Sequence, residues 1–170
     1  MDSHGEFRRQ DWSDEFNFVR KKLGCQSPGY LMHEAIRWSP HMRKWVFMPR
    51  RVSRQPYDDV ADEKRGSNKV VIVDESFTDA KIVEVKMKEP SPGLHGFSSF
   101  AFVPGTSDRH VMALRSVEED CTDDLDKCKQ RSYIVIFDVI TGEVLMDEKK
   151  IDQNMKFEGI EFVDMFTRPN

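Results

Sequence analysis

Hydrophobic and polar residues alternate with a period of two along most of the chain after residue 28, which is typical of half-buried β-strands. Before that point, Phe16, Val19 and Leu23 have helical spacing and predict one or two helical turns, with Ser13 as cap and Gly24 as the end. The segments predicted as strands are 30–38, 44–51, 69–74, 80–88, 97–104, 110–116, 132–139, 143–151 and 156–163. The pattern therefore predicts an all-β protein with a short helical arm.

The predicted strands fall into two consecutive sets of four, followed by one final strand. Glu34 and Ser98 lie in the first strand of each set, and Glu158 lies in the final strand at a similar interval. Four antiparallel strands that recur at a fixed period are typical of propeller blades, although a period of ~60 residues exceeds the ~40–50 of common blades. A β-sandwich of eight or nine strands fits the same pattern.

This repeat divides the chain into an arm, two repeats and a tail. We expect residues 1–28 to form an N-terminal arm with a short helix, and residues 29–92 to form the first β-blade. Residues 93–150 are expected to form the second blade, and residues 151–170 a closing strand and tail.

Glu34 occupies an unexpected place in its strand. The even-numbered residues of 30–38 are the more apolar set and should face a core, and Glu34 lies in their middle. A buried carboxylate is costly unless it is neutralised. Ser98 and Glu158 also lie among apolar neighbours, and converging oxygen donors suit a hard cation such as calcium. The alternative is that each of the three is an edge or loop residue.

Composition narrows the class of protein. The chain has 170 residues, 38% of them hydrophobic, and a net charge of −4 without a basic stripe, which argues against nucleic acid as a partner. No apolar run is long enough to span a membrane, and the N-terminus lacks the features of a signal peptide. Cys121 and Cys128 bracket a short acidic loop and either form a disulfide or remain free. A disulfide between them would leave Cys25 unpaired.

Four segments carry a resemblance to a known family. "GYLMHEAIRWS", "KWVFMPRRVS", "HGFSSFAFVPGT" and "KFEGIEFV" resemble the soluble calcium-activated nucleotidase family, also called the apyrase family. The motifs occur in the order and spacing of that family and cover nearly the whole chain. The resemblance implies a five-bladed β-propeller with one Ca²⁺ in its central tunnel.

The resemblance also implies roles for individual residues. Glu34, Ser98 and Glu158 fall on calcium ligands, and Arg50 falls on the phosphate-binding arginine, with Arg51 beside it as a second nucleotide-binding candidate. No residue of this chain is assigned as the catalytic acid or base. The implied activity is calcium-dependent hydrolysis of nucleoside di- and triphosphates such as UDP, GDP or ADP.

The family domain is about twice as long as this chain, so the resemblance implies a partial chain whose remaining blades and ligands lie N-terminal. The implied location of the full-length protein is outside the cell or in the lumen of the endoplasmic reticulum or Golgi. Two blades would leave two open sheet edges, which invite association into a homo-oligomer. The alternative functions are a non-catalytic β-domain and an inert fragment of the enzyme.

Overall fold

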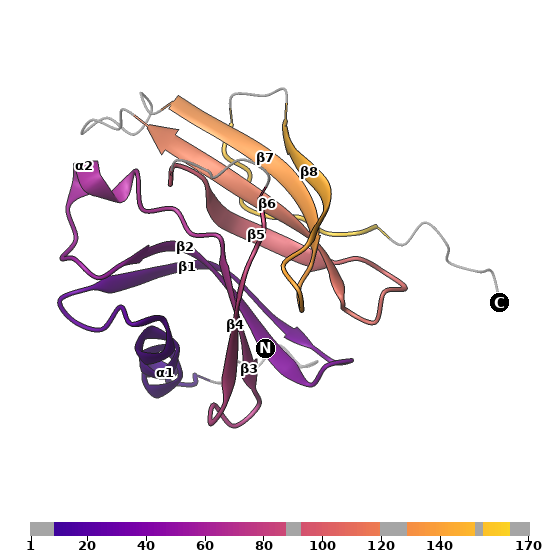
Figure 1. Ribbon diagram of the computed structural model, residues 1–170, viewed down its shortest axis with the longest axis horizontal. Helices are drawn as coiled ribbons and strands as arrows, with labels where there is room; N and C mark the ends of the chain where they lie inside the picture. The colour runs from indigo at the N-terminus through magenta and orange to yellow at the C-terminus, as the bar shows by residue number, and fades with distance from the viewer. Residues whose placement is uncertain (1–8, 88–92, 120–128, 152–154, 164–170) are drawn as a thin grey trace.

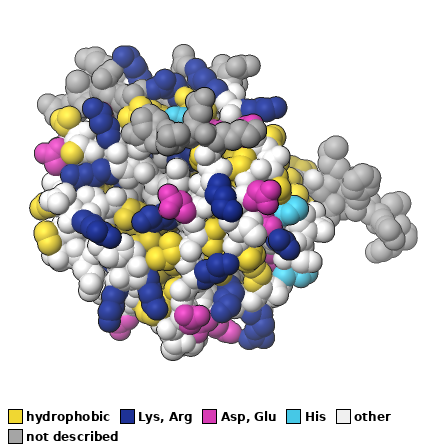
Figure 2. Space-filling model, viewed as in Figure 1, with side chains coloured by type: hydrophobic (Ala, Val, Ile, Leu, Met, Phe, Trp, Pro, Cys, Tyr) yellow, Lys and Arg dark blue, Asp and Glu magenta, His cyan; other side chains and the backbone are white. Residues whose placement is uncertain are grey.

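The structure is a computed structural model that describes residues 9–87, 93–119, 129–151 and 155–163. Helix α1 (Ser13–Leu23) lies against one side of a four-stranded sheet, and a second four-stranded sheet lies on the other side (Figure 1). On the face shown in Figure 2, Lys and Arg side chains are scattered among acidic and hydrophobic ones. Within the described residues, no helix is long and apolar enough to cross a membrane.

Helix α1 follows the predicted pattern. Val19 and Leu23 are buried, and Gly24 ends the helix in the left-handed conformation at φ 68°, where its N–H bonds back to the carbonyl groups of Arg20 and Lys21. The start differs by one residue from the prediction. Trp12 holds the capping position, while the Ser13 N–H and hydroxyl both donate to Asp11 Oδ1 at 2.9 and 2.6 Å.

Both sheets are antiparallel meanders in which the strand order follows the chain. The first contains β1 (Tyr30–Ser39), β2 (Lys44–Ser53), β3 (Lys69–Asp74) and β4 (Ala80–Glu84). The second contains β5 (Gly96–Phe102), β6 (His110–Glu119), β7 (Lys129–Asp138) and β8 (Val144–Lys150). Between β2 and β3, the polar loop also holds the short helix α2 (Asp59–Asp62). The first eight predicted strands are therefore confirmed, with shifted ends.

Two hydrophobic clusters hold the layers together. One lies between the sheets and includes Val46, Phe97 and Phe137, all fully buried. The other lies between the first sheet and α1 and includes Val19 and Phe47. Because both faces of the first sheet are covered, its β3 strand is a continuous apolar run rather than an alternating one.

The alternation predicted for residues 30–38 is wrong because β1 contains a β-bulge. His33 pairs with Pro49 and Ala35 with Met48, so the register shifts at Glu34. Ala35 therefore joins the cluster between the sheets, whereas Ile36 packs on the α1 side. A bulge inserts one extra residue and redirects side chains. Glu34 consequently lies on an exposed part of the backbone, not in the middle of an apolar face.

The final strand predicted at 156–163 is not formed. In the structure these residues carry no β-ladder, and serine side chains bond their backbone instead. The Ser132 hydroxyl accepts from Phe157 N–H and donates to Met155 O, both at 2.9 Å, and Ser98 Oγ donates to Phe157 O at 3.1 Å. These bonds draw residues 155–157 to the second sheet without a strand partner.

Candidate functional site

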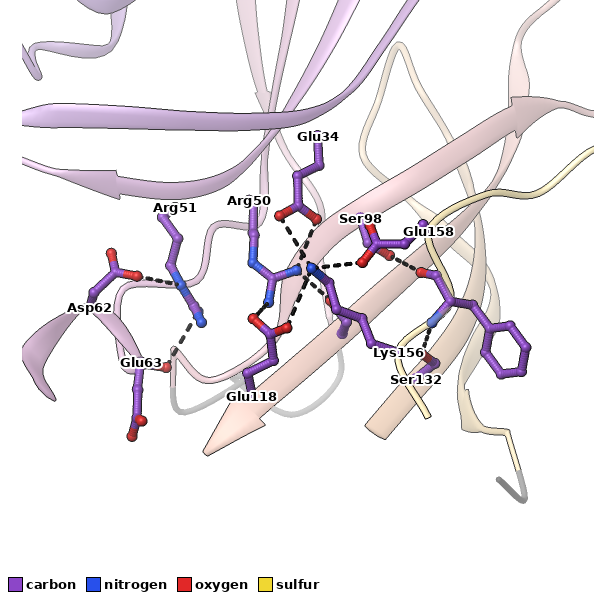
Figure 3. A network of polar contacts seen from close by, with 12 residues as sticks. Glu34, Arg50, Arg51, Asp62, Glu63, Ser98, Glu118, Ser132, Lys156 and Glu158 are labelled. Carbon is purple, nitrogen blue, oxygen red and sulfur yellow. Dashed lines mark hydrogen bonds and ion pairs between the residues drawn. The ribbon is translucent and has the colours of Figure 1, made fainter. Parts of the chain in front are cut away.

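The side chain of Arg50 lies at the junction of the two sheets, where it is 3% exposed. Its Nη1 donates to Glu34 Oε2 at 3.0 Å and to Ser116 Oγ at 2.5 Å, and its Nη2 donates to Glu118 Oε2 at 2.7 Å. The partners come from β1 and β6, so one guanidinium joins both sheets (Figure 3). A buried arginine needs such pairing, and two carboxylates also fix the orientation of its planar group.

Lys156 adds a second cation to the same place. Its Nζ lies 2.9 Å from Glu158 Oε1, 3.4 Å from Glu118 Oε1 and 3.5 Å from Glu34 Oε1. Burial alone would lower the pKa of Lys156, but the hydrogen bond to Glu158 and the charges of Glu34 and Glu118 raise it overall. Lys156 therefore remains charged and gathers three carboxylates around one ammonium group (Figure 3).

Ser98 lies next to this cluster and is 1% exposed. It sits at a β-bulge in β5, because Phe97 pairs with Arg115 and Ser99 with Leu114. This bulge corresponds to the one at Glu34, since each lies in the first strand of its sheet. The bulges turn both side chains toward residues 156–158: Glu34 contacts Lys156, and Ser98 contacts Phe157 O.

The structure thus brings four of the five predicted site residues into one neighbourhood: Glu34, Arg50, Ser98 and Glu158. Arg51 points elsewhere. Its Nε donates to Asp62 Oδ2 at 3.2 Å, and its Nη1 donates to the carbonyl oxygens of Glu63 and Leu94, both at 3.3 Å. Burial and the neighbouring charge of Arg50 lower the pKa of Arg51. Arg51 holds the loop that contains α2 against the end of the sheet (Figure 3).

Sequence reasoning missed three members of the cluster: Ser116, Glu118 and Lys156. Lys156 has the same parity as Glu158, and Ser116 and Glu118 share parity on β6, so alternation offered a weak signal for each. Charged residues near strand ends are more often solvated, which hid Glu118 and Lys156, whereas Ser116 is a neutral residue at the end of its predicted strand. Their convergence depends on contacts between residues far apart in the chain.

A second buried arginine occupies the corresponding end of the other sheet. Arg115, on β6, is fully buried and donates to Glu148 Oε1 at 3.1 Å, to Asn68 Oδ1 at 2.5 Å and to His95 O at 2.7 Å. His95 Nδ1 lies 2.8 Å from Glu148 Oε2. Burial raises the pKa of Glu148, but the His95 hydrogen bond and the Arg115 charge lower it overall. This network also joins the two sheets, because Arg115 belongs to the second sheet and Asn68 directly precedes β3 of the first.

The donors present match calcium in type. Glu34 and Glu158 supply carboxylate oxygens, and the Ser98 hydroxyl keeps lone pairs while it donates its proton to Phe157 O. Within residues that the structure describes, no group of three or more His, Cys, Asp or Glu side chains has the arrangement of a metal site. Lys156 Nζ is the cation that the two glutamates share here.

Some sequence predictions fall outside the described residues. Cys121 and Cys128 lie in 120–128, so whether they pair stays a prediction. Cys25 is a free, buried thiol, and burial raises its pKa.

The amino-acid sequence of this chain is similar to those of known apyrases and nucleotidases. The chain is 38% identical to an apyrase, apy-1, of Caenorhabditis elegans over 162 residues. This aligned region covers 95% of this chain and 43% of that protein. It is 36% identical over 159 residues to soluble calcium-activated nucleotidase 1 of Rattus norvegicus, which covers 94% of this chain and 36% of that protein. An apyrase of Cimex lectularius is 33% identical over 163 residues, with 96% and 42% coverage.

The chain therefore spans less than half the length of these three relatives. The family model described as Apyrase matches residues 1–163, which is nearly the whole chain. The similarity to these relatives and the family match confirm the resemblance indicated by the four sequence motifs. The matched range includes every residue of the charged cluster around Arg50 and Lys156. This chain belongs to the apyrase family.

Proposed function

We propose that the protein is a calcium-dependent nucleotidase that hydrolyses nucleoside di- and triphosphates, such as UDP, GDP or ADP, and releases phosphate. Family membership supports the reaction class, and the names of two relatives include calcium activation. The observation that extends the proposal to individual residues is the buried Arg50 guanidinium, which lies between the carboxylates of Glu34 and Glu118. Glu34 is itself a predicted calcium ligand, and Lys156 links it to a second one, Glu158. The proposed location is outside the cell or in the endoplasmic reticulum or Golgi lumen.

Glu34, Ser98 and Glu158 would hold the calcium ion. Two of them already lie around a single positive charge, since the Lys156 ammonium contacts both glutamates. Calcium takes six to eight oxygen ligands, so the three side chains do not complete its coordination shell even when both carboxylates bind through two oxygens. We propose that further blades of a five-bladed propeller, together with water, supply the rest.

When bound, calcium would neutralise phosphate charge and polarise a phosphoryl oxygen. Arg50 is the residue of this chain best placed to bind a phosphate group, because a guanidinium binds phosphate oxygens through paired N–H groups. Glu34, Ser116 and Glu118 hold that guanidinium in one orientation. Arg51 is fixed by Asp62 and two carbonyl groups, so we propose that it positions the adjacent loop and that Arg50 makes the phosphate contact.

Phosphate release by the full-length protein tests this proposal. We expect release from UDP, GDP and ADP that rises with added calcium and is abolished by excess chelator. Arg50→Ala should lower kcat/KM at least about 100-fold, because one preorganised electrostatic contact is typically worth that much. Arg43→Gln is the matched control, since Arg43 is 75% exposed on the β1–β2 hairpin. Undiminished release in chelator would overturn the calcium requirement.

One observation favours the alternative of a non-catalytic β-domain or inert fragment: the Lys156 ammonium already neutralises Glu34, Glu118 and Glu158. The same experiment separates the two readings. A folded full-length protein that binds nucleotide but releases no phosphate at any calcium concentration would support the non-catalytic domain. Activity confined to the full-length protein, with none in residues 1–170, would support the inert fragment.

A further inference from the structure

The chain has three tryptophans, and all three line one pocket on the α1 side of the first sheet. Trp12 immediately precedes α1, while Trp38 and Trp45 are directly paired residues of β1 and β2. Phe77, from the turn between β3 and β4, adds a fourth ring. The pocket has a volume of about 670 Å³, which is within the usual range for small-molecule sites.

The rings stand at steep angles to one another and form walls that face different directions. Trp12 and Trp45 lie 4.8 Å apart at 89°, Trp38 and Trp45 lie 5.2 Å apart at 60°, and Trp12 and Phe77 lie 5.7 Å apart at 79°. All four residues are half-buried, so part of each ring remains open to the pocket. Because the Trp38–Trp45 pair belongs to a β-ladder, these two walls are held in place by backbone pairing.

The charged lining residues of this pocket are both acidic. Glu15 and Glu75 contribute carboxylates, and the remaining polar lining residues, Gln10 and Ser76, are neutral. Arg43 pairs with Glu75 at 2.9 Å, but both side chains are more than half exposed, so the pair is weak and leaves the carboxylate available. The N-terminus of α1 carries about half a positive charge. Asp11, which accepts from the Ser13 N–H, offsets it.

We propose that this aromatic pocket binds a small organic cation with a quaternary ammonium group. The negative faces of aromatic rings attract a cation, tryptophan most strongly, and methylated ammonium groups fill such walls without needing hydrogen bonds. A metal ion would require several oxygen ligands, which rings do not supply. Trp12, Trp45 and Phe77 pack on the α1 side of the first sheet, whereas Arg50 contacts β6 of the second sheet, so this pocket is separate from the proposed nucleotide site.

Tryptophan fluorescence of the full 170-residue chain measures binding directly, because every tryptophan lines the pocket. The probes are choline and 3,3-dimethyl-1-butanol, which has the same shape without the charge, at constant ionic strength. We expect a saturable change with choline and at least about tenfold weaker binding of the neutral alcohol, as a desolvated cation–π contact predicts. Equal binding of both probes, or no saturable change with choline, would overturn the proposal.

Three variants locate the effect. Trp45→Leu removes the central wall and should abolish the choline response, with circular dichroism confirming that the sheets remain. Glu75→Gln should weaken choline binding several-fold and leave binding of the alcohol unchanged. Glu143→Gln is the matched control, because Glu143 is an exposed carboxylate in the β7–β8 connection, outside the pocket lining. Unchanged choline binding in folded Trp45→Leu would place the site elsewhere.

Discussion

At the residue scale, the neighbours Glu34 and His33 show how one bulge separates two environments. Glu34 reaches Arg50 and Lys156 at the junction of the sheets. His33 points to the α1 side, where its ring lies 5.0 Å from that of Phe16 and 5.4 Å from that of Phe47. Both ring nitrogens of His33 are buried and have no hydrogen-bond partner among the described residues. Burial lowers the pKa of His33 from 6.5 to about 4.

The lowered pKa of His33 predicts a loss of stability in mild acid. Between about pH 6.5 and 4 the unfolded chain binds a proton at His33 that the folded chain does not, so stability falls as pH falls. At about pH 5 the cost is roughly 2 kcal/mol. We expect His33→Phe, which preserves the aromatic packing, to remove this part of the pH dependence. Urea unfolding at about pH 7.5 and 5 measures it.

The control for this prediction is His41→Phe, since His41 is exposed in the β1–β2 connection. That variant should keep the pH dependence of the parent chain. If His33→Phe and the parent lose the same stability between the two pH values, His33 is not the group responsible.

At the element scale, the Arg115–Glu148 pair connects β6 to β8 within the second sheet. The Arg115 side chain is 0% exposed, and Glu148 supplies its only carboxylate partner among the described residues. Asn68 and His95 add contacts from the loops that precede β3 and β5. Removing a charge partner from a buried cation leaves that charge uncompensated, which is costly.

Glu148→Gln should therefore destabilise the fold by about 3 kcal/mol near neutral pH. The pKa of Glu148 is lowered in the folded chain, so its contribution is present above the unfolded value and is lost as pH falls through the folded value. The variant should lack this acid-dependent loss. Denaturant unfolding across the acid range measures both effects, with Glu143→Gln as a surface control. A change below about 0.5 kcal/mol at neutral pH would contradict a structural role for this pair.

At the scale of the whole molecule, the edge strands of the two sheets are β1 and β4, and β5 and β8, each paired with a single described strand. Of these, β4 and β8 each expose a large apolar side chain: Ile82 is 42% exposed and Leu145 is 49% exposed. Unpaired edges with apolar side chains are templates for pairing with another chain. Among the described elements, helix α1 covers the outer face of the first sheet, and no helix covers the outer face of the second (Figure 1).

We expect the isolated 170-residue chain to associate as its concentration rises through the micromolar range. Ile82→Lys together with Leu145→Lys should shift it toward monomer, because a charged residue on an edge strand disfavours edge pairing. Size-exclusion chromatography with light scattering measures the mass. Lys81→Glu is a control on the same strand that changes charge without removing an apolar side chain. A parent chain that stays monomeric throughout would refute edge-driven association.

Local pattern in the sequence determined the strands, the end of α1 at Gly24, and the family. Each of these depends on neighbouring residues: alternation of side chains, a glycine that accepts positive φ, and motifs in a fixed order. The prediction of a final strand at 156–163 was wrong because side chains, rather than the backbone of a neighbouring strand, bond this segment. Phe157 bonds to Ser98 and Ser132, and Ile160 O accepts from Arg37.

Only the tertiary structure decided how the charged residues meet. Two bulges, at Glu34 and Ser98, redirect side chains that simple alternation assigned to an apolar face. Arg50 meets Glu118 across the junction of two sheets, and Lys156 reaches Glu34 and Glu118 from the C-terminal segment. These contacts join residues far apart in the chain, so their geometry follows from how the layers pack. Local alternation carries no information about that packing, because it specifies which face a side chain occupies and not what lies opposite.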